Sequence, residues 1–541
     1  MAFRLPSAAR LEPTRASDVA SVSVAGAMHD PEPIDRGLSA KGDNGAAAPS
    51  PLTSIPSKQE IGRAVAAARA AQWHWRLEPL ETRVAALRRA ATAMLRRRAE
   101  VMALSRKEIG KVAAEALFFE GLGSLDAMAG WARVVRSAVR RRRVWLNPLS
   151  FPRKSAFVDY VPRGVVGVIA PWNYPAAGLY RPIFPALMTG NAVILKPSEH
   201  TPRTSAWLVD RLAEELPACL VQTVQGDGRT ATALIDAGID ACVFTGSVRN
   251  GQAVRIRCAE RGIPSSIEMG GKDAAIVLSD CDLPRTVAGI THWALSNAGQ
   301  ACGAIEIAYV EEAIADDFVA AMRRAWTRLT AESVAPLGNR QQLDLVRAHV
   351  EDARAKGADV VSGGVGPDSG LWYPPTLLDR CDERMSVIKD ETFGPILAII
   401  RIEALTEAVR SINQSRYGLG ASVWSRDLAR AQRIAERLEV GVVNINNHAF
   451  SGAIPSLPWS GTRETGFGVA NGAESLHTFV RPRVTTVDAS GGPDLYWMPY
   501  DDTLMGLGET LAEGQLGRFD GAWKLPHLIR HRLRTIRDFF R

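Results

Sequence analysis

The stretch AFVDYVPRGVVGVIAPWNYP, residues 156–175, decides the fold class of this 541-residue chain. Its short β-branched runs are broken by proline and glycine, and they end in a polar turn. The same pattern returns in NAVILKPSEH (191–200), ACVFTGS (241–247) and SIEMGGKDAAIVLSD (266–280), with the helical segment SAWLVDRLAEELP (205–217) among them. Short apolar runs that alternate with helical segments predict parallel βαβ units, and therefore an α/β fold.

The segments before this stretch have a different character. Residues 1–55 are rich in Ala, Ser, Pro, Gly and Asp and lack periodic apolar positions, so we expect a disordered N-terminal arm. A helix is predicted to begin after Ser57, because Glu60 follows it at the spacing of a capping box. The helical pattern continues over residues 81–110.

Composition and charge narrow the class of protein. Hydrophobic residues make up 46% of the chain, which is enough for a large core. The net charge of +7 is a small excess of 65 basic over 58 acidic residues, so no nucleic acid is expected as a partner. No apolar run approaches the ~18 residues that a membrane-spanning helix needs.

The cysteines indicate a reduced, cytoplasmic protein. None of them has C-x-x-C spacing or histidines at the spacing of zinc ligands, and a disulfide framework is improbable at this density. No metal site is therefore predicted. The six residues are Cys219, Cys242, Cys258, Cys281, Cys302 and Cys381.

Cys302 differs from the other cysteines in its surroundings. It lies in SNAGQACGAIEIA, residues 296–308, among small and polar residues that offer a thiol little to pack against. A reactive thiolate needs access and a stabilising environment, so Cys302 is a candidate nucleophile. The alternative is a small buried residue, the commoner fate of a free cysteine.

Two further residues would complete a site for attack on a carbonyl group. Asn173 lies between two prolines in the turn after an apolar run, where its amide could donate to a developing oxyanion. Glu268 follows another apolar run and precedes two glycines, which leave its carboxylate room to act as a base. The alternative for Asn173 is that it belongs to an ordinary turn. The alternative for Glu268 is a strand-end carboxylate that caps a turn.

Several strand ends carry features of a nucleotide site. Lys196 and Glu199 follow one strand, and an acidic residue there can bind a ribose 2′-OH, which favours NAD while leaving NADP possible. Gly246 and Ser247 stand at a strand-to-helix turn, where free N–H groups bind phosphate. Gly226 and Gly228 form a Gly-x-Gly that is more often a plain turn. The full G-x-G-x-x-G fingerprint is absent, so the site is not the standard Rossmann one.

Taken together, these motifs resemble the aldehyde dehydrogenase superfamily. Six motifs occur in the order and at the separations of that family, over roughly residues 57–487. They are PWNYP (171–175), KPSE (196–199), FTGS (244–247), EMGGKD (268–273), GQAC (299–302) and ETFGP (391–395).

The resemblance implies an NAD-dependent oxidation of an aldehyde to a carboxylic acid. It makes Cys302 the nucleophile that forms a thiohemiacetal and then a thioester, Asn173 the donor to its oxyanion, and Glu268 the base that activates water. The implied cofactor residues are Lys196, Glu199, Gly226, Gly228, Gly246, Ser247, Trp172, Glu391 and Phe393. The expected small-molecule partner is an aldehyde.

The resemblance also implies an architecture of two parallel-sheet α/β domains and a small β flap that joins subunits into a homodimer or homotetramer. The strand SLHTFVRPRVTTVD, 475–488, alternates well enough to belong to that flap. The implied ranges are an NAD-binding domain over 56–268, with 146–161 contributing to the flap, a catalytic domain over 269–445, a return segment and oligomerisation strand over 446–488, and a C-terminal extension over 489–541.

Some positions depart from the family pattern. Ile307 stands where many members carry Arg, Gly303 directly follows the nucleophile, and Ser460 and Thr465 replace a common Gly and Ser. None of these residues removes a catalytic role. They indicate an outlying branch, so the identity of the aldehyde does not follow from the resemblance.

The end of the chain predicts an amphipathic helix. In WKLPHLIRHRLRTIRDFFR, 523–541, apolar residues recur near helical spacing and arginines occupy much of the other face. Such a basic helix can lie on an anionic membrane, which would make peripheral membrane contact. The alternative, which we favour from the sequence, is a helix that docks on its own protein.

Two other functions compete with aldehyde oxidation. In a CoA-acylating enzyme the thioester passes to coenzyme A, but acylating relatives generally lack the glutamate that stands here at 268. A non-catalytic scaffold with the same fold would have no need to keep Cys302, Glu268 and Asn173 together.

Overall fold

The computed structural model describes residues 55–148, 150–366 and 369–541. The predicted N-terminal arm therefore lies outside the described residues except for Ile55. Helix α1 (Lys58–Trp75) begins at the predicted capping box: the Glu60 N–H donates to Ser57 Oγ over 3.2 Å, and the Ser57 N–H donates to the Glu60 carboxylate over 2.7 Å. The helical pattern of 81–110 forms α2 (Leu80–Arg96) and α3 (Arg98–Ile109).

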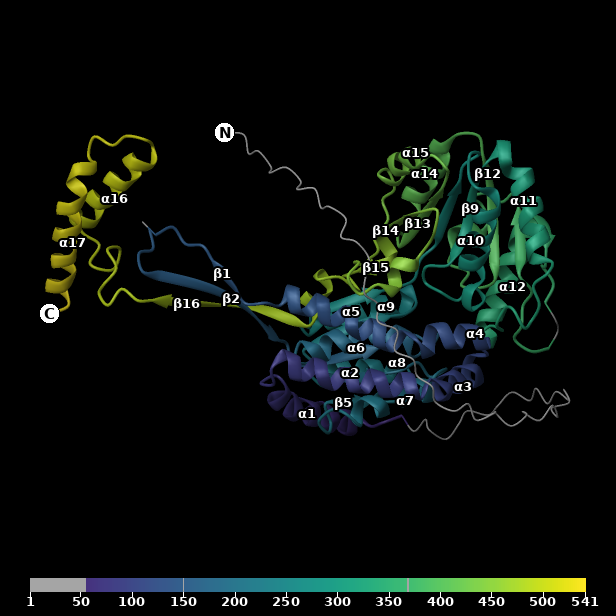
Figure 1. Cartoon of the computed structure of the whole chain (residues 1–541), viewed down its shortest axis with the longest axis horizontal. Coiled ribbons are helices and arrows are strands. Elements are labelled where there is room, and N and C mark those ends of the chain that lie inside the picture. Colours follow the sequence, from purple (N-terminus) through teal and green to yellow (C-terminus); the bar gives the residue numbers. More distant parts are fainter. Residues whose placement is uncertain (1–54, 149, 367–368) are drawn as a thin grey trace, which may run out of the picture. The chain divides into compact units, whose positions relative to one another are not determined.

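A layer of helices follows α3 before the first sheet begins. It consists of the single turn α4 (Ala113–Glu115), a π-helical turn (Ala116–Gly121) and the amphipathic α5 (Gly123–Ala138). The buried face of α5 includes Met128, Trp131 and Val135, which join the same hydrophobic core as α1 and α2. Helix α5 packs on α2 and on the later helix α6 (Ala177–Met188), beside which Figure 1 shows it.

The first sheet has six strands in the order β15-β7-β6-β3-β4-β5. All neighbours pair in parallel except β15, which is antiparallel to β7, so the predicted parallel βαβ units are confirmed. The strands are β3 (Val165–Ile169), β4 (Ala192–Lys196), β5 (Val221–Thr223), β6 (Ala241–Thr245), β7 (Ser265–Glu268) and β15 (Gly466–Phe467). Its connecting helices are α6 (Ala177–Met188), α7 (Pro202–Ala213), α8 (Gly228–Asp236) and α9 (Val248–Glu260).

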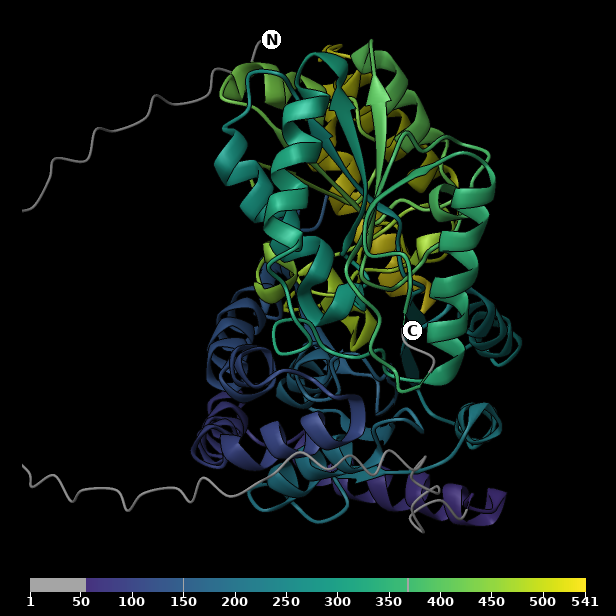
Figure 2. The same cartoon turned by 90° about the vertical axis from the view of Figure 1, so that its right-hand side faces the viewer.

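The second sheet has seven strands in the order β10-β11-β12-β9-β8-β13-β14, parallel except at β10. Figure 2 shows this sheet in teal and green with helices on both of its faces. The strands are β8 (Asp273–Val277), β9 (Ile305–Glu311), β10 (Asp359–Ser362), β11 (Thr376–Asp379), β12 (Ile396–Ile402), β13 (Gly420–Trp424) and β14 (Val442–Ile445). The helices are α10 (Leu283–Leu295), α11 (Glu312–Trp326), α12 (Arg340–Ala355), α13 (Ser386–Lys389), α14 (Leu405–Gln414) and α15 (Leu428–Ala435).

A third, antiparallel sheet consists of β1 (Arg142–Val144), β2 (Lys154–Pro162) and β16 (Val480–Asp488). The strand predicted over 475–488 begins only at Val480, because Glu474–Thr478 forms a 3-10 helix. Leu476 and Phe479 are buried in the core beside the first sheet, and the Phe479 carbonyl accepts from Asn191 Nδ2 over 3.0 Å. Packing against the core therefore shortens the strand at its start.

Beyond β16 the chain forms α16 (Asp502–Gln515) and α17 (Leu525–Phe539), so the predicted C-terminal helix is confirmed. Leu507 and Ile536 are buried where the two helices pack together. Among the residues that the structure describes, no helix has the length and apolar character needed to cross a membrane.

Candidate active site

The segment before Cys302 adopts a strained backbone that other residues hold in place. Within the 3-10 turn Ser296–Gly299, Asn297 and Ala298 have φ of 53° and 56°, in the left-handed region. The Asn297 N–H donates to the Glu115 carboxylate over 2.7 Å, and its Nδ2 donates to the carbonyl of Asn173 over 3.0 Å. Strain that is held by surrounding hydrogen bonds is typical of functional sites.

Cys302 is half-buried and packs against Leu419, Val442 and Trp459. The pKa of its thiol is raised well above the usual range, first by burial and then by the charge of Glu268, while Arg181 acts in the opposite direction. A thiol with a raised pKa is protonated at neutral pH. A base must therefore accept its proton before or during attack.

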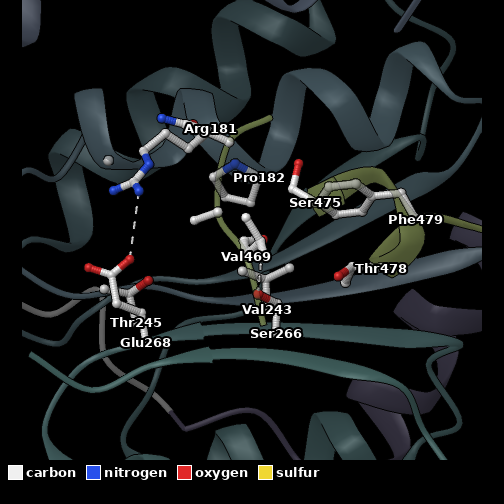
Figure 3. Close-up of a pocket in the computed structure, with 13 residues that line it drawn as sticks. Arg181, Pro182, Val243, Thr245, Ser266, Glu268, Val469, Ser475, Thr478 and Phe479 are labelled. Carbon is white, nitrogen blue, oxygen red and sulfur yellow. Dashed lines mark hydrogen bonds and ion pairs between the residues drawn. The ribbon is translucent and has the colours of Figure 1, made fainter. Parts of the chain in front are cut away.

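Glu268 ends strand β7 and lies beside the Cys302 thiol. Arg181, on α6, places its Nη2 3.7 Å from Glu268 Oε2, and Figure 3 shows the two side chains facing each other across one end of a pocket. The pocket is also lined by Thr245, Ser266 and Val469. Glu268 Oε1 is buried without a hydrogen-bond partner, which leaves it available to a thiol or a water molecule.

Asn173 is buried in the turn after β3, and its Nδ2 donates to the Gln300 carbonyl over 3.0 Å. An amide nitrogen carries two hydrogens, so one remains for a substrate oxygen. The main-chain carbonyl of Asn173 accepts from Lys111 Nζ over 3.0 Å, and Lys111 forms a fully buried ion pair with Glu120 at 2.6 Å. The sequence analysis does not single out Lys111 or Glu120, although they fix this turn.

The predicted adenosine residues lie at the carboxyl ends of β4 and β6. Lys196 Nζ lies 3.3 Å from Glu199 Oε2, and the Glu199 side chain is 51% exposed. Ser247 caps α9 by accepting from the Asn250 N–H over 3.4 Å. Gly246 directly precedes this cap, and a Cβ there would lie 2.7 Å from the Phe244 ring.

The predicted Gly-x-Gly lies at the start of α8. Gly226 has φ +140°, and a Cβ there would lie 2.1 Å from Thr230 Oγ1, so the backbone itself requires glycine. A Cβ on Gly228 would meet open space. No contact with the part of the chain that the structure describes therefore explains Gly228, whereas a backbone that a phosphate approaches closely would do so.

The loop of Glu391 and Phe393 is tied to strand β9 by Glu306, which belongs to a buried ion pair. The Glu306 carboxylate accepts from the N–H of both Thr392 and Phe393 over 2.8 Å and pairs with Lys272. Phe393 has φ 51°, and its ring lies 5.7 Å from that of Trp172. The two predicted cofactor residues Trp172 and Phe393 are thus brought together.

Glu391 lies beside the two glycines that follow Glu268. Its Oε1 accepts from the Gly271 N–H over 3.1 Å, and a Cβ on Gly270, at φ +82°, would lie 2.4 Å from the same oxygen. Burial, followed by repulsion from Glu306, raises the pKa of Glu391 to about 8. The carboxyl can therefore donate a proton in a hydrogen bond at neutral pH and accept one at higher pH.

Three departures from the family pattern have packing explanations. A Cβ on Gly303 would lie 3.1 Å from the Trp459 ring, so glycine lets that ring approach the nucleophile. The Cγ2 methyl of Thr465, which serine lacks, packs against Gly461, where a Cβ would lie 2.0 Å from it. Ile307 is buried in β9, where an unpaired arginine would be costly.

Comparison with known proteins gives one consistent result. Residues 52–485 match the family model described as "Aldehyde dehydrogenase family". The chain is 38% identical over 433 residues to 4,4'-diapolycopene aldehyde oxidase of Methylomonas sp, covering 79% of this chain and 81% of that protein. It is 35% identical over 442 residues to a protein of Mycolicibacterium smegmatis named "Putative succinate-semialdehyde dehydrogenase", with NADP(+) in its name. That match covers 79% of this chain and 84% of the relative.

A solved structure has the same fold. The chain superposes on "Putative Aldehyde Dehydrogenase PutA" from Anabaena variabilis with a TM-score of 0.78 and 29% identity, covering 82% of this chain and 96% of that one. The family match ends at residue 485, so the C-terminal extension over 489–541 lies beyond it.

Proposed function

The chain belongs to the aldehyde dehydrogenase family, whose members oxidise aldehydes to acids, and we propose that Cys302, Glu268 and Asn173 carry out this reaction here. The observation that supports the proposal most directly is that the Glu268 carboxylate, whose charge acts on the Cys302 thiol, keeps Oε1 buried and without a hydrogen-bond partner among the described residues. A nucleophile and a base from two different domains meet there, at the carboxyl end of β7.

The first half of the reaction forms and oxidises a thiohemiacetal. The Cys302 sulfur bonds to the aldehyde carbon while its proton passes to Glu268, because burial disfavours a free thiolate. The remaining N–H of Asn173 donates to the alkoxide oxygen. A bound nicotinamide cofactor would supply the acceptor for the hydride of this carbon, and the oxidation would leave a thioester on Cys302.

The second half hydrolyses the thioester. After the proton that came from Cys302 has passed to solvent, Glu268 takes a proton from a water molecule, whose oxygen bonds to the thioester carbon. The carbon–sulfur bond then breaks, the carboxylic acid leaves, and the Cys302 thiolate takes the proton that Glu268 holds. The same carboxylate therefore serves both halves, as its position beside the sulfur allows.

The chain's own residues fit a dinucleotide. We propose that Lys196 and Glu199 hold the adenosine ribose, that Ser247 and the N-terminus of α9 hold the pyrophosphate, and that Glu391 and Phe393 hold the nicotinamide end. The open space at Gly228 and the buried, sparsely bonded carboxyl of Glu391 support this fit. Glu199 favours NAD, because its carboxylate would repel a 2′-phosphate. NADP is the second candidate, since the Mycolicibacterium relative carries NADP(+) in its name.

We propose an apolar aldehyde as the substrate class. The residues packed on Cys302 are apolar, and the nearby guanidinium of Arg181 already faces Glu268. By its name, the relative from Methylomonas sp acts on 4,4'-diapolycopene aldehyde. A semialdehyde with a distal carboxylate is the alternative that the second relative's name suggests.

Assembly and location also remain proposals. We propose a homodimer or homotetramer joined through the sheet of β1, β2 and β16, since Val484 and Val487 are exposed on its outer strand. A cytoplasmic location accords with the six described cysteines, which are all unpaired.

The test is NADH or NADPH formation by purified protein against aliphatic, aromatic and semialdehyde substrates. Turnover that is lost in Cys302→Ala would support the proposed nucleophile, and turnover that survives would overturn it. Product identification separates the alternatives, because an acyl-CoA formed only with coenzyme A would indicate the acylating reaction. Cofactor binding without turnover on any aldehyde would indicate a scaffold.

A further inference from the structure

The C-terminal extension forms a small folded unit next to β2 and β16. Lys154, at the start of β2, pairs with Asp494 at 2.8 Å. The buried guanidinium of Arg532 in α17 donates to the carbonyls of Leu495 and Trp497 and to the Asp501 carboxylate. Figure 1 shows α16 and α17 side by side beyond the end of the strands. The extension is therefore ordered by its own contacts.

The packing of α17 on α16 leaves part of the apolar surface uncovered. Ile536 is buried between the helices, which accords with a helix docked on its own chain. The loop between the helices, however, exposes Leu516, Phe519 and Trp523 at 70%, 68% and 76%, and Phe539 and Phe540 are exposed at the end of α17. Exposed aromatic residues in such number mark an interaction surface.

We define residues 516–541 as the terminal surface, whose charge is strongly one-sided. Its exposed ionic side chains are basic with two exceptions, Asp520 and Asp538. The basic ones are Arg518, Lys524, Arg530, Arg534, Arg537 and Arg541. Basic residues interleaved with exposed Trp and Phe are the composition that binds the headgroup region of anionic membranes.

We propose that the terminal surface attaches this enzyme to an anionic lipid surface. The aromatic residues Phe519 and Trp523 enter the boundary between headgroups and acyl chains, and the arginines of α17 contact lipid phosphates. The helices lie on the membrane and do not cross it, since α16 and α17 have 14 and 15 residues.

A second copy of the chain fits this surface less well. A two-fold contact would bring the same surface from both copies together, and with it two sets of arginines of like charge. Glu513 of α16 offsets only one of these charges, because it pairs with Arg518 at 3.3 Å. An anionic lipid layer supplies the missing opposite charge.

The experiment is flotation of the full-length protein with phosphatidylcholine vesicles, with and without phosphatidylglycerol. We expect the wild type to float only with the anionic vesicles, and binding to fall as salt is raised. Phe519→Ser with Trp523→Ser should weaken binding by roughly tenfold or more. Arg534→Gln with Arg537→Gln should weaken it by a similar, salt-dependent factor.

Matched controls keep the test specific. Trp73 is an exposed tryptophan of α1, so Trp73→Ser removes an exposed aromatic side chain outside the terminal surface. Arg323 and Arg324 are exposed arginines of α11, so Arg323→Gln with Arg324→Gln removes two exposed positive charges outside that surface. They should float like the wild type. The proposal is overturned if the wild type does not float with anionic vesicles, or if the variants of the terminal surface float as well as the wild type. It is also overturned if the variants of the terminal surface change the oligomeric state and leave flotation unchanged.

A second readout rests on the proposed function. A long-chain aldehyde delivered in anionic vesicles should be oxidised more slowly by the Phe519→Ser, Trp523→Ser variant, while kcat/KM for a short, water-soluble aldehyde is unchanged. Flotation needs no catalysis, so a failure of the proposed reaction and a failure of membrane attachment are distinguishable.

Discussion

Nη2 of Arg181 lies 3.7 Å from Oε2 of Glu268, and both groups act on the Cys302 thiol in opposite directions. Glu268 raises the pKa of the thiol and Arg181 lowers it. The arginine therefore offsets part of the cost of keeping a carboxylate next to a nucleophile that must lose a proton.

Replacement of these two charges should move thiol reactivity in opposite directions. Arg181→Gln removes the positive charge, raises the pKa of Cys302 further and slows alkylation by iodoacetamide at a given pH. Glu268→Gln removes the negative charge, lowers the same pKa and speeds alkylation. The measurement is the alkylation rate as a function of pH, with Cys302→Ala as the background. Shifts in the same direction for both variants would contradict this account of the pair.

The buried Lys272–Glu306 pair should be costly to break. Lys272→Met leaves the Glu306 carboxylate buried without its cation, and such a loss typically costs about 3–5 kcal/mol. It should also loosen the loop of Thr392 and Phe393, whose N–H groups Glu306 holds. The measurement is the denaturant midpoint, together with the dissociation constant for NAD.

An exposed pair of the same type provides the comparison for Lys272. Lys356 lies 2.7 Å from Asp352 on the surface of α12, and Lys356→Met should cost only about 0–1 kcal/mol. Adding Glu306→Gln to Lys272→Met should recover part of the loss, because no uncompensated charge remains. Equal costs for the buried and the exposed lysine would show that the pair does not organise the loop.

Glu199 should set the preference between NAD and NADP. A 2′-phosphate near its half-exposed carboxylate meets like charge, which costs about 1 kcal/mol at ~4 Å in water. Glu199→Gln should therefore raise kcat/KM with NADP by roughly fivefold and lower it with NAD. Glu436→Gln, an exposed carboxylate of the second domain, is the control. A wild type that already prefers NADP would contradict the role of Glu199.

Most of the first sheet could be predicted because the local sequence pattern is enough to identify its strands. The runs that become β3, β4 and β6 are short, apolar and closed by polar turns, and period and length suffice to place them. The start of β16 was harder to predict, because Leu476 lies in a 3-10 helix, Phe479 follows that helix, and both side chains pack into the core. Tertiary packing decides that boundary, and no local pattern records it.

The candidate site likewise contains some residues that local sequence patterns predict and others that they do not. Cys302, Glu268 and Asn173 stand in recognisable turns, whereas Lys111 reaches the Asn173 carbonyl across 62 residues of sequence from a helical region without a motif. Arg181 likewise lies within α6, where a basic residue has no distinctive neighbours. Residues that position a catalytic group through a long-range contact become visible only when the chain is folded.

Asn173 should contribute mainly to the first chemical step. Its Nδ2 is held by the Gln300 carbonyl at 3.0 Å, so the second N–H is oriented before substrate arrives. Asn173→Ala should lower kcat by about 10²–10³, the usual cost of losing one oxyanion donor, with a much smaller change in KM. Since thioester formation becomes slow, the burst of NADH in the first turnover should disappear.

The matched comparison for Asn173→Ala is Glu268→Gln. That variant lacks the base for hydrolysis, so any thioester that it forms persists, and NADH should appear as a burst of up to one equivalent per site followed by slow turnover. Both variants should keep a Cys302 that iodoacetamide can modify, which shows that the site is folded. If Asn173→Ala retains a full burst at the wild-type rate, its side chain does not stabilise the oxyanion, and the donor must be sought among the main-chain N–H groups near Cys302.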